Sequence, residues 1–479
     1  MPLILPGNVA SATASTTYDV ANSCRFNDGD TAYMHKTMGT PSDIEIFTWS
    51  AWIKRGVITQ NSQLFSYEAG SSANRQFIRF NSADQFEHAL TVSSTLSQQV
   101  TNRKFRDCSA WYHIVVAVDT NQGTAANRVK IYVNGVQESS FSTETYPAQY
   151  LDTIINTSGN KPSVGASWDG STPEAHFDGY MAEVYFIDGT QYAASDFGEF
   201  DEDSPTIWKP KDASGLTFGT NGFYLDFKDS ANLGNDANGG TDLTEVNLAA
   251  ADQATDTPTN NFATVNPLDN YYQGHAFSQG NCKVTSTNSD TSFHTSTFAV
   301  SSGKWYAEVK VDGTDDSGGT TNVGIAGKLS TSTTNYIGAD AQHFAYRANE
   351  GNKETGGSNS SYGSGWGDNA LIGIYLDLDN NKLYFSEDGT LQNSGTGISI
   401  TAPASVDMGA YVMGAGDRHT GAHIDLVWNF GGCPSFTVSS AVADDNGYGS
   451  FEYSPNITGD SEAKKFYALN TKNLAEYGG

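Results

Sequence analysis

The residues best suited to chemistry in this sequence are loop aromatics with polar side chains beside them. A sugar is held by an aromatic ring that stacks on its apolar face and by polar groups that bond its hydroxyls. The alternative for each such residue is packing against its own domain, as for most loop aromatics. The candidate carbohydrate-binding or partner-binding residues are Trp168, Asp169, His176, Asp178, His343, Tyr346, Arg347, Tyr362, Trp366, Asp417, Arg418 and His419.

Clustered aspartates offer the hard oxygen ligands that calcium prefers. They occur at Asp28-Gly-Asp30, at Asp312 with Asp315 and Asp316, and at Asp377 with Asp379. The string Asp377-Leu-Asp-Asn-Asn381 is typical of a tight turn, because Asp and Asn side chains bond their own backbone there. Asp312, Asp315 and Asp316 therefore stay as the calcium candidates, and no other cofactor is predicted.

Catalytic motifs are missing from the sequence. Retaining glycoside hydrolases need two carboxyl groups about 5 Å apart, which jelly-roll enzymes carry on one strand. The nearest string, Glu199-Phe-Asp-Glu-Asp203, lacks a further Glu at the required offset and precedes Ser204-Pro205, so we expect a loop. Neither a Gly-x-Ser-x-Gly elbow nor a His-Glu-x-x-His helix occurs. The chain is predicted not to be an enzyme, and polysaccharide depolymerisation is the least favoured alternative.

The charge balance argues against two classes of binding partner. The 479 residues include 54 acidic and 26 basic ones, which gives a net charge of −28. Nucleic acid and anionic membranes both attract clusters of Lys and Arg, so neither is a predicted partner. We find no apolar run of the ~20 residues that span a membrane. The N-terminus does not have the features of a signal peptide, so we expect synthesis in a host cytoplasm.

The four cysteines are spread along the chain without the spacing of a metal motif. They are Cys24, Cys108, Cys282 and Cys433. We predict that they are free and buried rather than joined in a disulfide framework.

Short strands are the elements that must position the candidate residues. Residues 47–53 and 129–133 alternate between apolar and polar side chains, as in a half-buried strand. Residues 114–118 are apolar throughout, which indicates the middle of a sheet. Asn134-Gly135 supplies the two left-handed residues of a tight hairpin, and residues 222–227 are expected to form a late return strand.

The second half of the chain has the same character. Residues 305–311, 372–376 and 424–430 alternate, and long polar loops connect them. Trp305 and Trp428 fall in phase with the apolar positions, as Trp49 does in the first half, so all three are predicted core residues. Together with 49 Gly, 24 Tyr and 25 Phe, this pattern predicts an all-β chain of two antiparallel β-sandwiches in tandem.

Composition divides the chain into four predicted parts. Residues 1–22 form an N-terminal arm that could dock onto a partner, and residues 23–235 form the first sandwich. Residues 236–268, rich in Asp, Asn, Thr, Gly and Pro, are predicted to be a linker. Residues 269–479 form the second sandwich with a C-terminal extension.

Two groups of strings resemble known domains. Those of the first half, Trp49–Lys54, Trp111–Asp119, Val129–Val136 and Phe177–Val184, resemble the strands of a concanavalin A-like or laminin-G-like jelly roll. Those of the second half, Gly303–Val309, Gly373–Gly389 and Val427–Gly432, resemble a SPRY domain. The resemblance to SPRY implies a binding face formed by loops.

The order of the two domains and of the strings between them is similar to structural proteins of tailed bacteriophages, especially phages of marine bacteria. These strings include Phe186-Ile-Asp-Gly189, Trp208-Lys-Pro210, Asp256-Thr-Pro-Thr-Asn260 and Ala468–Leu474. The resemblance implies a virion protein, expected as a tail-fibre or appendage adhesin that attaches to a host glycan or protein. Its implied partners are other virion proteins and copies of itself, as in a trimeric fibre. The alternative is a capsid decoration or a purely structural fibre segment.

Overall fold

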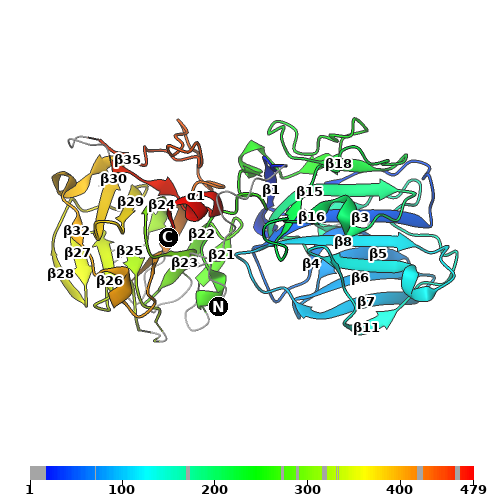
Figure 1. The fold of residues 1–479 in the computed structure, drawn as a ribbon, viewed down its shortest axis with the longest axis horizontal. Helices are drawn as coiled ribbons and strands as arrows, with labels where there is room; N and C mark the ends of the chain where they lie inside the picture. Colours follow the sequence, from blue (N-terminus) through cyan, green and yellow to red (C-terminus); the bar gives the residue numbers. More distant parts are fainter. Residues whose placement is uncertain are drawn as a thin grey trace. The chain divides into compact units, whose positions relative to one another are not determined.

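The computed structural model describes residues 18–68, 70, 72–168, 173–270, 275–286, 291–314, 321–330, 332, 334–417, 424–458 and 464–478. These residues form mostly strands and loops, with a short C-terminal helix α1 (Thr471–Tyr477), which confirms the all-β prediction. No helix among them has the length and apolar character needed to cross a membrane. The chain divides between Thr259 and Asn260 into two compact units (Figure 1). We call residues 18–259 the first unit and residues 260–478 the second unit.

The first unit consists of two antiparallel sheets. One has the strand order β10 (Val136–Gln137), β9 (Val129–Val133), β8 (Trp111–Asp119), β3 (Ile46–Arg55), β15 (Gly179–Asp188), β1 (Ser23–Phe26) and β20 (Gln253–Ala254), with β18 (Phe223–Leu225) paired to β15. The other has the order β11 (Phe141–Thr145), β7 (Thr95–Lys104), β6 (Gln85–Val92), β5 (Arg75–Phe80), β4 (Ser62–Glu68), β12 (Ser163–Val164), β2 (Tyr33–His35) and β19 (Thr244–Val246). Two small hairpins join β13 (Ser167–Trp168) with β14 (Pro173–Glu174), and β16 (Gly198–Phe200) with β17 (Trp208–Pro210).

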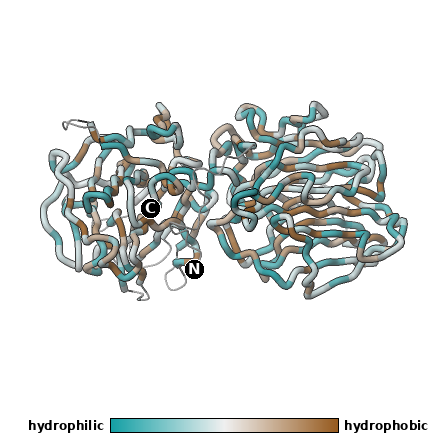
Figure 2. The backbone as a smooth tube through the Cα atoms, in the orientation of Figure 1, coloured by the Kyte–Doolittle hydropathy of each residue, from teal (hydrophilic) through white to brown (hydrophobic). Residues whose placement is uncertain are grey.

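The core of the first unit follows from alternation along these strands. Residues 47, 49, 51 and 53 of β3 are fully buried in one hydrophobic cluster, and β18 adds Phe223 and Leu225 to it. In Figure 2 hydrophobic stretches accompany the strands of this unit. The hairpin between β9 and β10 turns at Asn134 and Gly135, whose φ angles of 47° and 79° match the predicted left-handed pair. The predicted strands, return strand and core Trp49 are therefore confirmed, but residues 47–53 are buried on both faces rather than half-buried.

The segment predicted as a linker belongs to the two units instead. Residues 244–246 form β19 at the edge of one sheet, and residues 253–254 form β20 beside β1. Asp256 accepts a bond from Lys54 Nζ at 2.7 Å, and both side chains are buried. Beyond the division, the Ala263 amide donates to the Leu469 carbonyl in the second unit. The bounds 236–268 of the linker stay a prediction, and the short edge strands within them show that polar turn-rich composition also suits paired strands.

The predicted arm is described only from Tyr18 onward, and residues 1–17 lie outside the described part. The Tyr18 hydroxyl donates to Glu183 at 3.0 Å, and the Val20 amide donates to Thr259 Oγ1 at 3.1 Å. Val20 is buried. Residues 18–22 therefore pack on the first unit rather than standing apart from it.

The second unit also has two main sheets. One has the order β21 (His275–Ser278), β22 (Lys283–Ser286), β34 (Ile424–Asn429), β24 (Lys304–Thr314), β29 (Leu371–Asp377), β30 (Lys382–Glu387) and β31 (Thr390–Leu391); β32 (Ile398–Ser399) pairs with β30, and β37 (Tyr467–Ala468) pairs in parallel with β24. The other has the order β23 (His294–Val300), β33 (Tyr411–Asp417), β25 (Thr321–Ala326), β26 (His343–Arg347), β27 (Asn352–Thr355) and β28 (Ser358–Ser361). A further pair joins β35 (Asn456–Ile457) with β36 (Lys464–Lys465). Short 3₁₀ turns occur in the two units at Asp28–Asp30, Ala125–Asn127, Ala194–Asp196, Ala250–Asp252, Pro267–Asn270, Gln392–Gly395 and Pro403–Ser405.

The core between these sheets contains Trp305 and Trp428, 0% and 1% exposed, as their phase in the sequence predicts. On the other face of the first of these sheets, Glu308 of β24 is fully buried and holds the C-terminal segment in place. Its carboxylate accepts bonds from Asn429 Nδ2 at 2.9 Å and from the amides of Glu452 and Tyr453 at 3.1 and 2.8 Å. The Tyr306 hydroxyl is the fourth donor, at 3.1 Å. A buried carboxylate is thus held by neutral donors alone.

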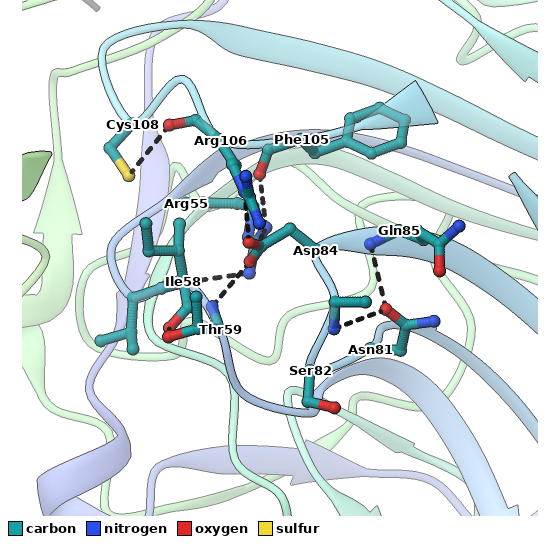
Figure 3. A network of polar contacts seen from close by, with 12 residues as sticks. Arg55, Ile58, Thr59, Asn81, Ser82, Asp84, Gln85, Phe105, Arg106 and Cys108 are labelled. Carbon is teal, nitrogen blue, oxygen red and sulfur yellow. Dashed lines mark hydrogen bonds and ion pairs between the residues drawn. The ribbon is translucent and has the colours of Figure 1, made fainter. Parts of the chain in front are cut away.

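A buried carboxylate of the first unit is held in a different way, by pairing with cations. Arg55, at the end of β3, lies 3.2 Å from Asp84 Oδ1, and both side chains are fully buried. Arg106 approaches the other oxygen of Asp84 at 2.7 Å, and the Thr59 amide donates at 2.6 Å. Figure 3 shows these groups converging on the Asp84 carboxylate. Cys108 lies beside them, and all four cysteines are buried in the described part of the chain with no disulfide among them.

Candidate binding site

The second unit has a surface hollow of about 460 Å³, within the range of ordinary ligand pockets. It lies where β29 begins and β30 ends, and its polar or aromatic lining residues are Asn349, Trp366, Asp368, Asn369, Glu387 and Asp388. Two loop stretches that supply lining residues meet nearby in the sequence, where the Gly363 amide donates to the Gly351 carbonyl at 2.8 Å. Gly351 has a φ of 64°, and a Cβ there would come within 2.3 Å of the Gly363 carbonyl. Glycine at position 351 therefore permits the close approach of the two stretches.

Trp366 joins this hollow to the hydrophobic core. Its amide donates to the Ala348 carbonyl at 2.9 Å, and its ring lies 5.8 Å from the ring of Tyr346. The side chain is 6% exposed, and the indole Nε1 has no hydrogen-bond partner among the described residues. A buried N–H without an acceptor costs free energy.

Three carboxylates line the same hollow. Asp388 accepts a bond from the Leu371 amide at 3.0 Å, and Asp368 accepts one from the Asn369 amide at 3.1 Å. Burial, followed by the charge of Asp388, raises the pKa of Glu387. The lining has neither Lys nor Arg, and within the described chain none of the three carboxylates forms an ion pair. The hollow therefore combines a tryptophan with negative charge that no cation in its lining offsets.

Trp366 is the predicted residue that lines this hollow, and the other predicted residues of the second half lie elsewhere. Tyr346 and Tyr362 are 0% and 6% exposed and pack on Phe385 in the core. The His343 ring stacks on Phe293 at 5.4 Å, and its Nε2 donates to the Lys328 carbonyl at 2.8 Å. Side chains held in this way present no open face to a sugar in this structure.

Arg347 and Asp417 are likewise engaged in the fold. Arg347 pairs with Glu350 at 3.6 Å, and Asp417 is 1% exposed at the end of β33. Arg418 and His419 lie outside the described residues. Ligand contact by all of these residues stays a prediction.

The predicted residues of the first half are only partly described. Trp168 lies in β13, and Asp169 falls outside the described residues. His176 is half-buried, with its ring 6.0 Å from that of Tyr33. Asp178 is 1% exposed, and neither of its oxygens forms a hydrogen bond of good geometry with a described residue. Burial, followed by the charge of Asp28, raises the pKa of Asp178 to about 8.

The calcium candidates do not gather in the described chain. Asp312 pairs with Lys283 at 2.9 Å, and Asp315 and Asp316 lie outside the described residues. Asp377 bonds the Asn380 amide at 3.1 Å, as expected of a turn residue. The described residues contain no group of three or more His, Cys, Asp or Glu side chains placed to hold a metal ion.

The structure also reveals a serine and histidine pair that the sequence does not suggest. Ser50 Oγ lies 2.9 Å from His113 Nε2, deep in the first unit. Trp208 Nε1 donates to His113 Nδ1 at 3.0 Å, so the imidazole proton must be on Nε2 and is donated to Ser50. Burial lowers the pKa of His113 to about 3. His113 is neutral and points its proton at the hydroxyl, so it cannot activate Ser50 as a nucleophile.

The carboxylate string considered for hydrolysis gives no catalytic pair. Glu199 lies in β16, which forms a small hairpin with β17. Asp201 follows this strand and pairs with Lys209 at 3.3 Å. The Asp201 side chain also accepts bonds from the amides of Asp203 and Ser204. Asp201 thus organises a turn, as the sequence indicates.

Comparison with protein families identifies the two domains. Residues 28–194 match the family model of the concanavalin A-like lectin/glucanases superfamily, and residues 304–402 match that of the SPRY domain. The chain therefore has a concanavalin A-like domain followed by a SPRY domain, which confirms that part of the resemblance. These matches concern domains and carry no information about a virion. No curated protein matches the chain.

Solved structures give more distant matches. A putative carbohydrate binding protein from Bacteroides ovatus is 16% identical, with 48% of this chain and 59% of that chain covered and a TM-score of 0.32. The SPRY domain of human HERC1 is 14% identical, with 32% and 89% covered and a TM-score of 0.25. A SAP-like pentraxin from Limulus polyphemus is 16% identical, with 36% and 78% covered and a TM-score of 0.27. Likeness at this level carries no functional conclusion.

Proposed function

We propose that the chain is a non-enzymatic binding protein that holds a glycan in the hollow beside Trp366. One observation carries the proposal: Trp366 and five polar residues together line a hollow of about 460 Å³. Asn349 and Asn369 add amide groups, and the carboxylates add acceptors for sugar hydroxyls. This mixture of a tryptophan with planar polar groups suits a carbohydrate better than an apolar ligand.

The finer part of the proposal is a virion adhesin. It is supported by the order of domains and connecting strings in the sequence, which is similar to tailed-phage structural proteins. Many copies on a particle would turn weak contacts of a shallow hollow into useful avidity. Locating the chain in a purified particle tests this part, and a position from which the hollow faces other virion chains would favour the purely structural alternative.

A glycan array with the full chain tests the glycan proposal. Trp366→Phe keeps an aromatic ring in the core but replaces the larger indole that lines the hollow, so we expect it to reduce glycan binding about three- to tenfold. Trp49→Phe is the matched control, because Trp49 Nε1 also lacks a partner among the described residues but lies in the core of the first unit. Equal binding by both variants, or no glycan bound by the intact chain, would overturn the proposal. Release of reducing ends from a bound polysaccharide would overturn the non-enzymatic part.

A further inference from the structure

We infer that two copies of this chain associate edge to edge through β28, the outermost strand of a sheet in the second unit. β28 (Ser358–Ser361) ends the six-stranded sheet, with β27 on its inner side (Figure 1). All four of its residues are exposed. The inference goes beyond the proposed function, because it concerns a surface for a second copy of the chain rather than the glycan hollow.

The outer edge of β28 lacks the usual protection of an edge strand. Most exposed edges carry a charged side chain, a proline or a bulge, which prevents pairing with another chain. The sequence of β28 is Ser-Asn-Ser-Ser, and its register with β27 is continuous. By contrast β11, at an edge in the first unit, has the acidic residue Glu144 and a register shift between Phe141 and Thr143. β28 is therefore an edge to which another strand can add.

The hairpin of β27 and β28 determines which backbone groups of β28 point outward. Two glycines with φ of 59° and 71° form its two-residue turn, so Thr355 and Ser358 make the first hydrogen-bonded pair. Such pairs alternate along an antiparallel ladder, so Ser360 also bonds β27, whereas Asn359 and Ser361 direct their N–H and C=O groups outward. Within the described chain, no hydrogen bond uses these outward groups.

The outward groups define one register for a second copy. Asn359 of each copy forms a hydrogen-bonded pair with Ser361 of the other, and the two Ser360 residues face each other across a two-fold axis. The side chains that meet, Asn with Ser and Ser with Ser, are small and polar, so they neither clash nor repel. The contact closes after two copies, because both use the same strand.

The charge of the chain favours this contact between copies. Each chain has a net charge of −28, so two chains repel each other except where the meeting surfaces are uncharged. Residues 355–367, which include β28, contain no Asp, Glu, Lys, Arg or His. A basic partner would instead be attracted to the acidic residues elsewhere on the chain. A second copy is therefore the occupant that suits this edge.

The size of the contact indicates a weak association. Four residues per copy bury far less than the roughly 800 Å² per partner of a stable interface. We therefore expect a dimer that is populated at high protein concentration, or where copies are already held close together.

Sedimentation of the full chain over a concentration series tests the inference. We expect a monomer–dimer equilibrium whose Kd rises at least about tenfold in Ser361→Pro. Proline there removes an outward N–H, spares the bonds to β27, and is tolerated on an edge strand. Ser360→Glu and Ser360→Lys should each prevent dimer formation by opposing like charges, and mixing the two variants should restore it. Ser142→Glu is the matched control, because Ser142 is exposed on the edge strand β11.

A disulfide tests the register directly. Facing residues of a pair without hydrogen bonds have Cα atoms about 4.5 Å apart, within the range of about 4.4–6.8 Å that a disulfide spans. Ser360→Cys should therefore form a cross-linked dimer on oxidation, at least about tenfold faster than Ser142→Cys. The four native cysteines are buried and should not compete.

Several outcomes would overturn the inference. One is a monomer at every concentration together with equal cross-linking of Ser360→Cys and Ser142→Cys. Another is a dimer that Ser361→Pro leaves unchanged, which would place the contact elsewhere. A trimer, or charge variants that do not associate when mixed, would also contradict the two-fold pairing. None of these measurements uses a glycan, so the proposed function is tested separately.

Discussion

Two buried carboxylates, one in each unit, are held in opposite ways. In the first unit, Arg55 and Asp84 form a pair that is fully buried on both sides. In the second unit, Glu308 is as deeply buried, but its partners are Asn429, Tyr306 and two backbone amides. Neutral donors satisfy the oxygens of a carboxylate without compensating its charge, whereas a guanidinium does both.

The difference appears in the pKa values. Burial acts to raise the pKa of Asp84, but the Thr59 amide, Arg106 and Arg55 outweigh it and lower the pKa. Burial raises the pKa of Glu308 to about 7, against the lowering effect of its four donors. Ionised Asp84 therefore stabilises the first unit at pH values above the ordinary pKa of an Asp side chain. Glu308 makes the stability of the second unit depend on pH near neutrality.

The largest effect is expected where a buried charge loses its partner. Asp84→Asn leaves Arg55 uncompensated and should lower the free energy of unfolding of the first unit by about 3–5 kcal/mol. Asn tolerates the positive φ of 63° at this position, so the turn itself is kept. Hydrogen exchange of β3 measures the loss, with Asp226→Asn as control because its partner Lys228 is 57% exposed. A loss no larger than that of the control would show that the Arg55 pair is not the main determinant.

The next effect is a pH dependence in the second unit. Folding raises the pKa of Glu308 from 4.5 to about 7, so the folded chain binds this proton more tightly than the unfolded chain. The resulting stability is fully present below pH 4.5 and is lost as the pH rises through 7, by up to ~3 kcal/mol. Glu308→Gln should remove this dependence.

Hydrogen exchange of β24 in wild type and Glu308→Gln, at pH values from 5 to 8, provides the measurement after correction for intrinsic exchange. The unfolding free energy of the wild type minus that of Glu308→Gln should fall as the pH rises, because only the wild type loses stability from this group. A difference that stays constant or grows would mean that the four donors hold Glu308 ionised throughout.

The smallest effect is expected at the exposed partner of the buried pair. The Arg106 side chain is 49% exposed although it lies 2.7 Å from Asp84. Arg106→Ala should therefore cost less than ~1 kcal/mol in the unfolding free energy of the first unit, because solvent already screens this charge. Urea unfolding at pH 7 measures it. A cost equal to that of Asp84→Asn would identify Arg106, rather than Arg55, as the partner that Asp84 needs.

Much of the fold could be predicted because its strands carry a period of two. Residues 47–53 and 305–311 alternate over enough positions to place Trp49 and Trp305 in the cores. The edge strands β19 and β20 could not be predicted in this way, since two or three residues show no period. Their attachment depends on distant pairs such as Lys54 with Asp256, which no local pattern reveals.

The candidate site was less predictable. Trp366 could be selected because it is an aromatic residue near polar ones in the sequence. Tyr346 and Tyr362 meet the same criterion, but they lie in the core. Glu387 and Asp388 stand where a strand ends and a turn begins. That they line the same hollow as Asp368 depends on how the chain pairs in space. The Glu-Asp-Gly string after an alternating strand was the one available signal for them.

The place of β1 beside β20 determines how the first unit would respond to a pulling force. Ser23 pairs with Ala254, and Cys24 pairs with Gln253, so the strands that begin and end the unit are antiparallel neighbours. A force applied to the chain before Ser23 and after Ala254 acts at the same end of this pair. It would load the hydrogen bonds one after another rather than all at once, so the unit would yield by unzipping from its ends.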